Sequence, residues 1–247
     1  MAVKGCKGRI FVDQYDFSLD TNGITIDFET PVLESSTFQA CDIQKQPSLN
    51  GVVIKQNGYF DDGAEGGLDK EINDRLGVAG NFIVTTIIGT DQTIPVAYSM
   101  NYAFAKSLNL NTPVVELITI NAEWVSQGTD GRAAFRGYQV YYGTLSATGA
   151  VTGIDFGAAV SAGGKAFLHI VTITGTATNA QIKIQSDSAS NFATAADEGT
   201  FTFSAVGTQT VDLSGTVNRY VRANVVTLGG ATSFLVALVV CTNGGTY

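Results

Sequence analysis

Apolar and polar residues alternate along much of the second half of the chain. In residues 180–185, Ile182 and Ile184 would share one face of a strand, and residues 199–206 repeat the pattern. Because alternate side chains of a strand point to opposite faces of a sheet, this pattern predicts strands with one buried face. Residues 233–241 are nearly all apolar, which predicts a central strand that is covered on both faces.

The first half of the chain shows the same strand pattern with one interruption. Seven strands are predicted there, over residues 9–12, 23–28, 51–59, 82–88, 96–104, 114–124 and 136–142. Between the third and the fourth, Leu68, Ile72 and Leu76 recur every four residues, which predicts a short helix over residues 67–76. Gly77 follows at the position where a glycine commonly caps a helix.

The composition agrees with an all-β fold and excludes two classes of protein. The 247 residues include 28 glycines and only 4 prolines, and 15% are charged, against about 25% in an average soluble domain. The net charge is −8. A nucleic-acid-binding protein needs a basic face, and a protein held at a membrane surface by lysine and arginine needs a basic helix, so neither class is expected.

The charge is distributed unevenly, which suggests two domains. Residues 1–136 carry 17 acidic and 10 basic side chains, whereas residues 137–247 carry 5 and 4. All four prolines also lie in the first part. Residues 143–153 are small, polar and interrupted by glycines, as is typical of a linker. We therefore predict one β domain over residues 1–142 and a β-sandwich over residues 154–247.

The cysteines and the ends of the chain give no sign of export. Cys6, Cys41 and Cys241 are far apart and form no CxxC pair, so we expect three reduced thiols in a protein that is assembled in the cytosol. The first residues lack the apolar segment of a secretory signal. The longest apolar run, residues 234–241, is much shorter than the roughly 20 residues of a membrane-spanning helix.

No residue pattern predicts catalysis, a metal site or a cofactor. The lone histidine, His169, lies in an apolar strand without a neighbouring nucleophile or acid, so a structural role is expected. The acidic stretches 61–65 and 187–191 lack the spacing of a calcium loop and are expected to be turns. The glycine-rich residues 63–67 lack the lysine of a phosphate loop. The chain is therefore not expected to be an enzyme.

Four aromatic residues leave two interpretations open. Trp124, Tyr138, Tyr141 and Tyr142 could form a platform on which a sugar ring stacks. Aromatic residues in strands also fill cores and subunit interfaces, which is the ordinary role of such residues.

Several segments, taken in their order along the chain, resemble phage tail tube (major tail) proteins. The resemblance covers nearly the whole chain, and each segment alone is weak. The first part contributes KGRIFVDQYDFS at 7–18, ITIDF at 24–28, LESSTF at 33–38 and LNGVVIKQNGYFD at 49–61, followed by the predicted helix. The second part contributes 167–176, 182–188 and 217–223, which resemble the appended jelly roll, of galactose-binding type, in the same proteins. Asn50-Gly51 replaces the Asp-Gly that is common in the family, and either pair suits a turn.

The resemblance implies a tail-tube-type β-barrel or sandwich with one short helix, followed by a jelly-roll β-sandwich, and a structural role in the virion. Six copies would close a ring, and the rings would stack into a tube through which phage DNA passes without specific binding. An acidic wall would repel the phosphates. The other partners would be further tail proteins and, through the C-terminal sandwich, a glycan of the host surface. No membrane partner is expected, and assembly would take place in the cytoplasm of the bacterial host.

The long polar connection over residues 37–49 is our candidate for the contact between stacked rings, and a mobile surface loop is its alternative. The candidate contact residues are Thr37, Phe38, Gln39, Asp42, Gln44, Lys45 and Gln46.

Three alternative functions remain open at this point. A capsid decoration or accessory virion protein could use the same sandwich, and a carbohydrate-binding module could use the aromatic residues. A glycan-active enzyme would need a pair of carboxylates, and the few acidic residues after position 136 form no recognisable pair.

Overall fold

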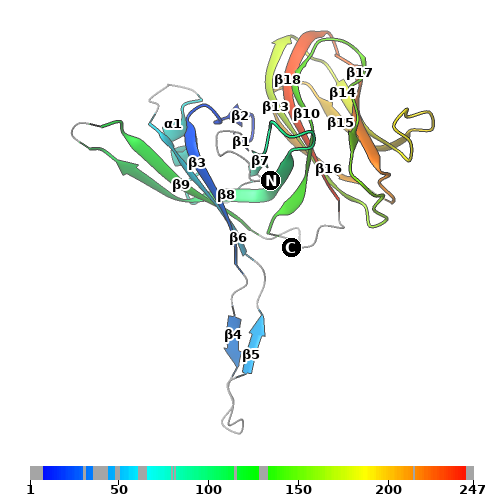
Figure 1. Cartoon of the computed structure of the whole chain (residues 1–247). Helices are drawn as coiled ribbons and strands as arrows, with labels where there is room; N and C mark the ends of the chain where they lie inside the picture. The colour runs from blue at the N-terminus through cyan, green and yellow to red at the C-terminus, as the bar shows by residue number, and fades with distance from the viewer. Residues whose placement is uncertain are drawn as a thin grey trace. The chain divides into compact units, whose positions relative to one another are not determined.

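The computed structural model describes residues 8–29, 32–35, 44–47, 51–60, 66–78, 80, 82–113, 116–127, 133–213 and 215–242. Within these ranges the chain folds into antiparallel strands and one helix, α1 (Leu68–Asp74) (Figure 1). The all-β prediction is therefore confirmed. No helix in these ranges has the length and apolar character that crossing a membrane requires.

The chain divides into two compact units, each built from separate stretches of sequence. Unit 1 contains Met1–Leu19, Ile83–Ser99 and Phe135–Tyr247, and unit 2 contains Asp20–Phe82 and Met100–Ala134. The two units are described one at a time below.

Unit 1 contains a β-sandwich. Its first sheet has the order β16-β13-β18-β10, formed by β10 (Phe135–Leu145), β13 (Gly164–Gly175), β16 (Gly207–Leu213) and β18 (Ala231–Thr242). Its second sheet has the order β11-β17-β14-β15, with β12 also on β17, formed by β11 (Gly149–Ala150), β12 (Ile154–Asp155), β14 (Ala180–Asp187), β15 (Ala196–Phe203) and β17 (Tyr220–Thr227). Apart from the neighbours β14 and β15, the strands pass back and forth between the two sheets in the order of an eight-stranded jelly roll, in which β11 and β12 share one edge.

The core of the sandwich explains the alternation in the sequence. Ile182 and Ile184 of β14 and Phe201 of β15 are buried in one apolar cluster with Leu168 of β13 and Leu238 of β18. Residues 236–241 of β18 are buried without interruption, because this strand lies between β10 and β13 and is covered on both faces. The prediction of a central strand here is confirmed.

The predicted linker lies inside the sandwich. Gly143, Thr144 and Leu145 are the last residues of β10, where they pair with β18, and Leu145 is buried in the core. The linker prediction for these three residues is wrong because their partners in β18 lie some ninety residues later, where no local pattern shows them. The division of the chain into separate domains at residues 143–153 stays a prediction.

The first sheet of unit 1 continues beyond β10 through strands from the start of the chain. The order is β10-β8-β7-β1-β2, with residues 96–99 of β8 (Val96–Asn111), then β7 (Phe82–Ile88), β1 (Gly8–Val12) and β2 (Tyr15–Asp16). A second apolar cluster joins this part of the sheet to β13 and β18 and includes Phe11, Ile87, Phe135, Phe167 and Val239. Strands that the sequence assigns to the N-terminal domain thus belong to the same unit as the sandwich.

Unit 2 is a four-stranded sheet with α1 packed on one face. The order is β3-β6-β9-β8, formed by β3 (Thr21–Glu29), β6 (Gly51–Tyr59), β9 (Thr119–Ser126) and residues 100–111 of β8. Gly58 marks the helix contact, because a Cβ there would lie 2.8 Å from the Leu68 Cδ2. The predicted helix is confirmed, and Gly77 takes a φ of +67°, the left-handed conformation that glycine favours.

Two strand boundaries differ most from the sequence prediction. β8 continues to Asn111, seven residues past its predicted end, because its polar end pairs with β9. β9 begins at Thr119, five residues after its predicted start. Pairing with a neighbouring strand sets both limits, and the hydrophobic pattern alone does not show it.

Candidate functional site

The connection between β3 and β6 forms a separate two-stranded ladder. Strands β4 (Val32–Ser35) and β5 (Gln44–Pro47) pair in antiparallel register, with Glu34 opposite Lys45 and Ser35 opposite Gln44. Of the predicted ring-contact residues, Gln44, Lys45 and Gln46 lie in β5. Thr37, Phe38, Gln39 and Asp42 lie outside the described residues. The predicted loop is thus in part a β-hairpin, and its role as a contact between rings stays a prediction.

The face of the unit 2 sheet opposite its buried core is polar and balanced in charge. Asn57, Asn121 and Asn109 lie opposite one another on β6, β9 and β8. Two ion pairs lie beside this row: Lys55 with Asp27 at 2.7 Å, and Lys106 with Glu123 at 3.1 Å. The acidic excess of residues 1–136 therefore does not lie in the described part of this face.

One end of the same sheet exposes four large apolar side chains, which we call the apolar rim. Tyr59 ends β6 and is 42% exposed, and Leu110, near the end of β8, is 49% exposed. Leu117 and Ile118 precede β9 and are 69% and 37% exposed. The four residues lie at one end of three adjacent strands, because Tyr59 pairs with Thr119 and Leu110 pairs with Ile120. Exposed apolar side chains that gather at one end of a sheet are candidates for an interface.

Trp124 belongs to the core of unit 2. It is fully buried, and its indole Nε1 donates a hydrogen bond of 3.1 Å to the Gln56 Oε1. Gln56 in turn donates to the Thr21 hydroxyl at 2.8 Å. The ring faces of Trp124 are therefore closed to a sugar, and its place in a stacking platform is wrong. The sequence could not show this, because the alternation of apolar and polar residues shows which side chains share a face of the strand but not which face is buried.

The three tyrosines of β10 have different surroundings in unit 1. Tyr138 packs on Phe156, with ring centroids 5.1 Å apart. Tyr142 stacks under the Arg9 guanidinium at 3.5 Å, and its hydroxyl donates to the Asp16 carboxylate at 3.1 Å. Burial, together with the negative charge of Asp16, raises the pKa of Tyr142. Tyr141 is half-buried, and burial raises its pKa as well.

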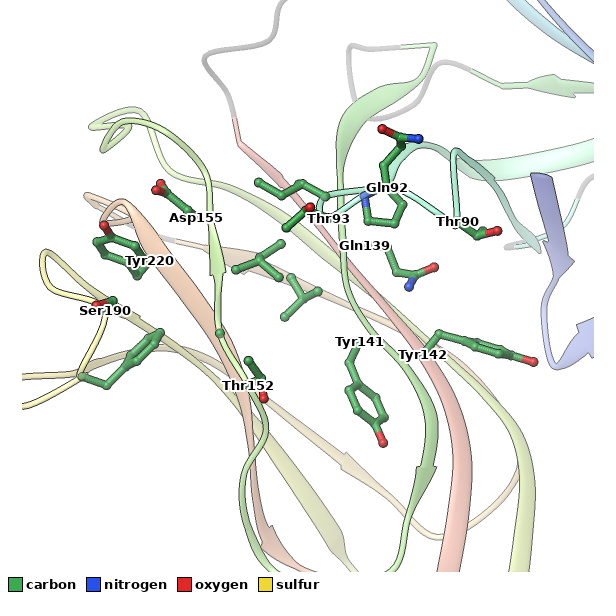
Figure 2. A pocket seen from close by; sticks show the side chains of 16 residues that line it. Thr90, Gln92, Thr93, Gln139, Tyr141, Tyr142, Thr152, Asp155, Ser190 and Tyr220 are labelled. Atoms are coloured by element: carbon green, nitrogen blue, oxygen red, sulfur yellow. The ribbon is translucent and has the colours of Figure 1, made fainter. Parts of the chain in front are cut away.

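Tyr141 and Tyr142 line a half-open cavity in unit 1 of about 560 Å³ (Figure 2). The cavity is enclosed by five separate stretches of chain: residues 90–95, 139–142 of β10, 152–155, the loop residues 190 and 192, and Tyr220 at the start of β17. Its volume is that of a small-molecule site. Sequence reasoning found two of its aromatic residues and missed Phe192 and Tyr220, because nothing local connects five stretches that lie up to 130 residues apart.

His169 lies at the centre of a buried polar chain. Its Nδ1 donates to the Asp13 carbonyl oxygen at 2.7 Å, and its Nε2 accepts from the Thr85 hydroxyl at 2.8 Å. Thr85 also bonds the Ser99 hydroxyl at 2.9 Å. Burial lowers the pKa of His169 to about 4, so the ring is neutral at pH 7. These contacts fit the structural role predicted for this residue.

The other groups that could carry chemistry are also engaged in the fold. Asp187 accepts hydrogen bonds from the backbone N–H groups of Ala189 and Thr194, and these bonds lower its pKa. Cys241 is a free buried thiol that donates to the Phe135 carbonyl, and burial raises its pKa. Within the described ranges, no cluster of three or more acidic, His or Cys residues could hold a metal ion. Residues 61–65, Cys6 and Cys41 lie outside those ranges.

Comparison with known proteins gives remote structural likenesses only. No family profile matches the chain, and no curated protein matches it. It is similar to a chain of the virion of a native gene transfer agent particle, with 13% identity over 52% of this chain and 96% of that one and a TM-score of 0.39. It is similar to a chain of the sheath/tube terminator of PVC, an extracellular contractile injection system, with 13% identity, 55% and 96% coverage and a TM-score of 0.41.

A third likeness extends over most of the chain. The SPP1 Dit protein, a paradigm of the hub adsorption apparatus in phages that infect Gram-positive bacteria, is 11% identical over 94% of this chain and 98% of that one, with a TM-score of 0.34. All three likenesses are distant in sequence and in superposition.

Proposed function

We propose that the chain is a structural subunit of a phage tail, whose copies close into rings, six to a ring, that stack into a tube for the passage of DNA. The observation that carries the proposal is the apolar rim of Tyr59, Leu110, Leu117 and Ile118 in unit 2. A rim of this kind on a chain with so few charges suits a surface that a neighbouring copy covers. The proposal that the assembly consists of stacked rings comes from the sequence segments that, in their order along the chain, resemble tail tube proteins.

Strand β3 offers a second contact between neighbouring copies. Among the described strands it pairs with β6 alone, so one edge of its nine residues is open. An open edge of this length is a template for another strand. In a closed ring, each subunit contacts the next one through two different surfaces, and this head-to-tail contact repeats around the ring. The apolar rim and the open edge of β3 would therefore meet other surfaces of the next subunit.

The hairpin of β4 and β5 is the proposed contact between one ring and the next. It interrupts the connection between two long strands and forms a ladder of its own. A hairpin of this kind can add its strands to a neighbouring sheet. Further tail proteins would meet the ends of the tube, and subunits would be made and assembled in the host cytoplasm.

DNA would pass through the tube without being held. The chain has a net charge of −8, so phosphates are repelled by the assembly as a whole. In the described part of unit 2, the basic residues Lys55, Arg75 and Lys106 each form an ion pair with a carboxylate. We assign no reaction to the chain.

Replacement of residues 37–49 by a short Gly-Ser turn tests the proposal. We expect a folded protein that no longer forms stacked tubes, because the contact between rings is lost while the sheet of unit 2 is kept. Size-exclusion chromatography and negative-stain electron microscopy at high protein concentration measure this. The control exchanges Ser204–Val206, the turn between β15 and β16, for Gly-Ser-Gly and should keep the tubes. Unaltered tubes in the first variant would contradict the role of the hairpin, and a wild-type protein that stays monomeric would overturn the function.

A further inference from the structure

We propose that Tyr141 closes an open edge of β10 and so prevents a second strand from pairing with the sandwich there. The inference concerns unit 1 alone and does not depend on the tail role, since β3, the β4–β5 hairpin and the apolar rim belong to unit 2. It rests on three observations: an edge without a strand partner, the uncharged sequence of that edge, and the hydrogen bond that the Tyr141 hydroxyl makes to it.

One edge of β10 loses its strand partner partway along the strand. Pairing with β8 covers Phe135–Tyr138, and pairing with β18 on the other side continues to Leu145. Directly after the part that pairs with β8, the Gln139 N–H donates to the Pro95 carbonyl oxygen at 3.0 Å. Among the described residues, no strand pairs with this edge over residues 140–145. The edge therefore offers backbone groups with which another strand could pair.

The sequence of this edge favours pairing with a further strand. Residues 139–145 read QVYYGTL and contain no charged residue and no proline. Valine, tyrosine and threonine favour strands, and uncharged segments of this length pair readily with one another when their edges are exposed. Proteins usually protect an open edge with a lysine, a proline or a bulge. β10 has a bulge between Gln139 and Tyr141, which disrupts pairing only where the open edge begins.

The backbone groups at the open edge belong to two residues beyond the bulge. The Gln139 N–H points away from β18, toward Pro95. Alternate residues of a strand direct their backbone groups to the same side, and the bulge adds one residue, so the groups of Tyr142 and Thr144 also point away from β18. An added strand would form its hydrogen bonds with the N–H and C=O groups of these two residues.

The Tyr141 hydroxyl occupies one of these groups. It donates a hydrogen bond of 3.1 Å to the Thr144 carbonyl oxygen. Burial raises the pKa of Tyr141 above its ordinary value of 10.0, so the hydroxyl keeps its proton at neutral pH and remains a donor. The hydroxyl thus takes the place that an N–H of an added strand would occupy, and it would have to be displaced before such a strand could pair.

Packing holds the Tyr141 ring beside β10. The ring packs against the apolar core of the sandwich, and the Tyr141 and Tyr142 side chains leave the strand in different directions (Figure 2). Gly143 leaves room for the ring, because a Cβ there would lie only 3.1 Å from the Tyr141 hydroxyl oxygen. Gly143 also has a φ of +151°, in the region that favours glycine. The ring is therefore a fixed cover, which keeps copies of the chain from joining through β10.

Removal of the hydroxyl tests the proposal. Tyr141→Phe keeps the ring and frees the Thr144 carbonyl, so two copies should pair through β10, with self-association about tenfold tighter than that of the wild type. Tyr142→Phe is the matched control, because it removes a hydroxyl that bonds the Asp16 side chain and not the edge. Its self-association should equal that of the wild type. Sedimentation velocity over a series of protein concentrations measures both variants.

Hydrogen exchange shows where the copies meet. In Tyr141→Phe, the amides of residues 139–145 should become protected as the concentration rises, because strand pairing bonds the N–H groups of Tyr142 and Thr144. In the wild type, these amides should exchange at the same rate at every concentration. Assembly through unit 2 would instead protect the residues of the apolar rim. Failure of this inference and failure of the tail role therefore give different results.

A charged residue on the edge should restore the wild-type behaviour. Thr144 is exposed, so Thr144→Lys can be combined with Tyr141→Phe without disturbing the core. The lysines of two pairing edges would repel each other, and we expect the double variant to sediment as the wild type does. Three results would overturn the proposal: equal self-association of Tyr141→Phe and either the wild type or Tyr142→Phe, protection in Tyr141→Phe that lies outside residues 139–145, or concentration-dependent protection of these residues in the wild type.

Discussion

At the scale of single residues, His169 shows how one side chain joins distant parts of the sequence. Its two ring nitrogens bond Asp13 and Thr85, which lie 156 and 84 residues away along the chain. The apolar strand around His169 was sufficient to predict a buried structural residue. Neither partner could be predicted, because Asp13 contributes a backbone carbonyl, a group that every residue has.

The neutral state of His169 makes the stability of the fold depend on pH. Its pKa is about 4 in the folded protein and about 6.5 in the unfolded chain, so below pH 6.5 protons bind preferentially to the unfolded chain. The contribution of His169 is complete above pH 6.5, and about 3 kcal/mol should be lost as the pH falls to 4.

Urea unfolding of the wild type and of His169→Asn at pH 7.5, 6, 5 and 4 measures this effect. The asparagine keeps a donor for the Asp13 carbonyl and does not titrate. The difference in unfolding free energy between the two proteins should shrink steadily below pH 6.5, since the carboxyl groups are common to both. A difference that is constant from pH 7.5 to 4 would contradict the buried neutral state.

At the scale of elements, α1 was predictable in place, but its length of seven residues and its buried polar pair were not. The four-residue recurrence of Leu68 and Ile72 identifies the face that packs on the sheet. The sequence also shows two pairs of opposite charges at a spacing of four, Lys70 with Asp74 and Glu71 with Arg75, without distinguishing them. The structure exposes the first pair and buries the second, because Glu71 and Arg75 lie on the side of the helix that faces the protein.

The two ion pairs of α1 should differ strongly in their effect on stability. Arg75→Ala leaves the Glu71 carboxylate buried and should cost about 3 kcal/mol, since Arg75 bonds both the side chain and the carbonyl of Glu71. Lys70→Ala breaks the exposed pair and should cost less than about 1 kcal/mol. Thermal and chemical unfolding of both variants measure the difference. Equal losses would mean that the Glu71–Arg75 pair is hydrated like the exposed one.

At the scale of the whole molecule, local patterns predicted strands well and their partners poorly. β6 and β7 have the limits that the alternation predicts, and β18 is central, as its apolar run predicts. The neighbours of β10 are β8 and β18, which begin 39 residues before it and 96 residues after it. The composition of residues 143–153 predicted a linker at the end of β10, because a short stretch of sequence does not show that its residues pair with a strand so far away. The cavity escaped prediction for the same reason.

The apolar rim should matter only to the assembled protein. Leu117→Lys changes a residue that is 69% exposed, so the unfolding free energy of the monomer should change by no more than about 0.5 kcal/mol. In a ring the lysine would be buried without a partner, and ring formation should be lost. Analytical ultracentrifugation and electron microscopy measure this. Val206→Lys, at a position 48% exposed in unit 1, is the control and should assemble normally. Rings of normal stability in Leu117→Lys would exclude the rim from the interface.

The interleaving of the two units has a consequence for the order in which the protein can fold on the ribosome. The chain passes between the units after residues 19, 82, 99 and 134. Among the described strands, β18 at the centre of the sandwich is translated last, and β10 and β13 cannot complete their ladders until it emerges. After its last residue, Leu145, β10 therefore keeps an open edge until β18 begins at Ala231, and β13 does so from Gly175 onward. Chaperone protection during translation should consequently matter more to the yield of soluble subunit than its final stability does.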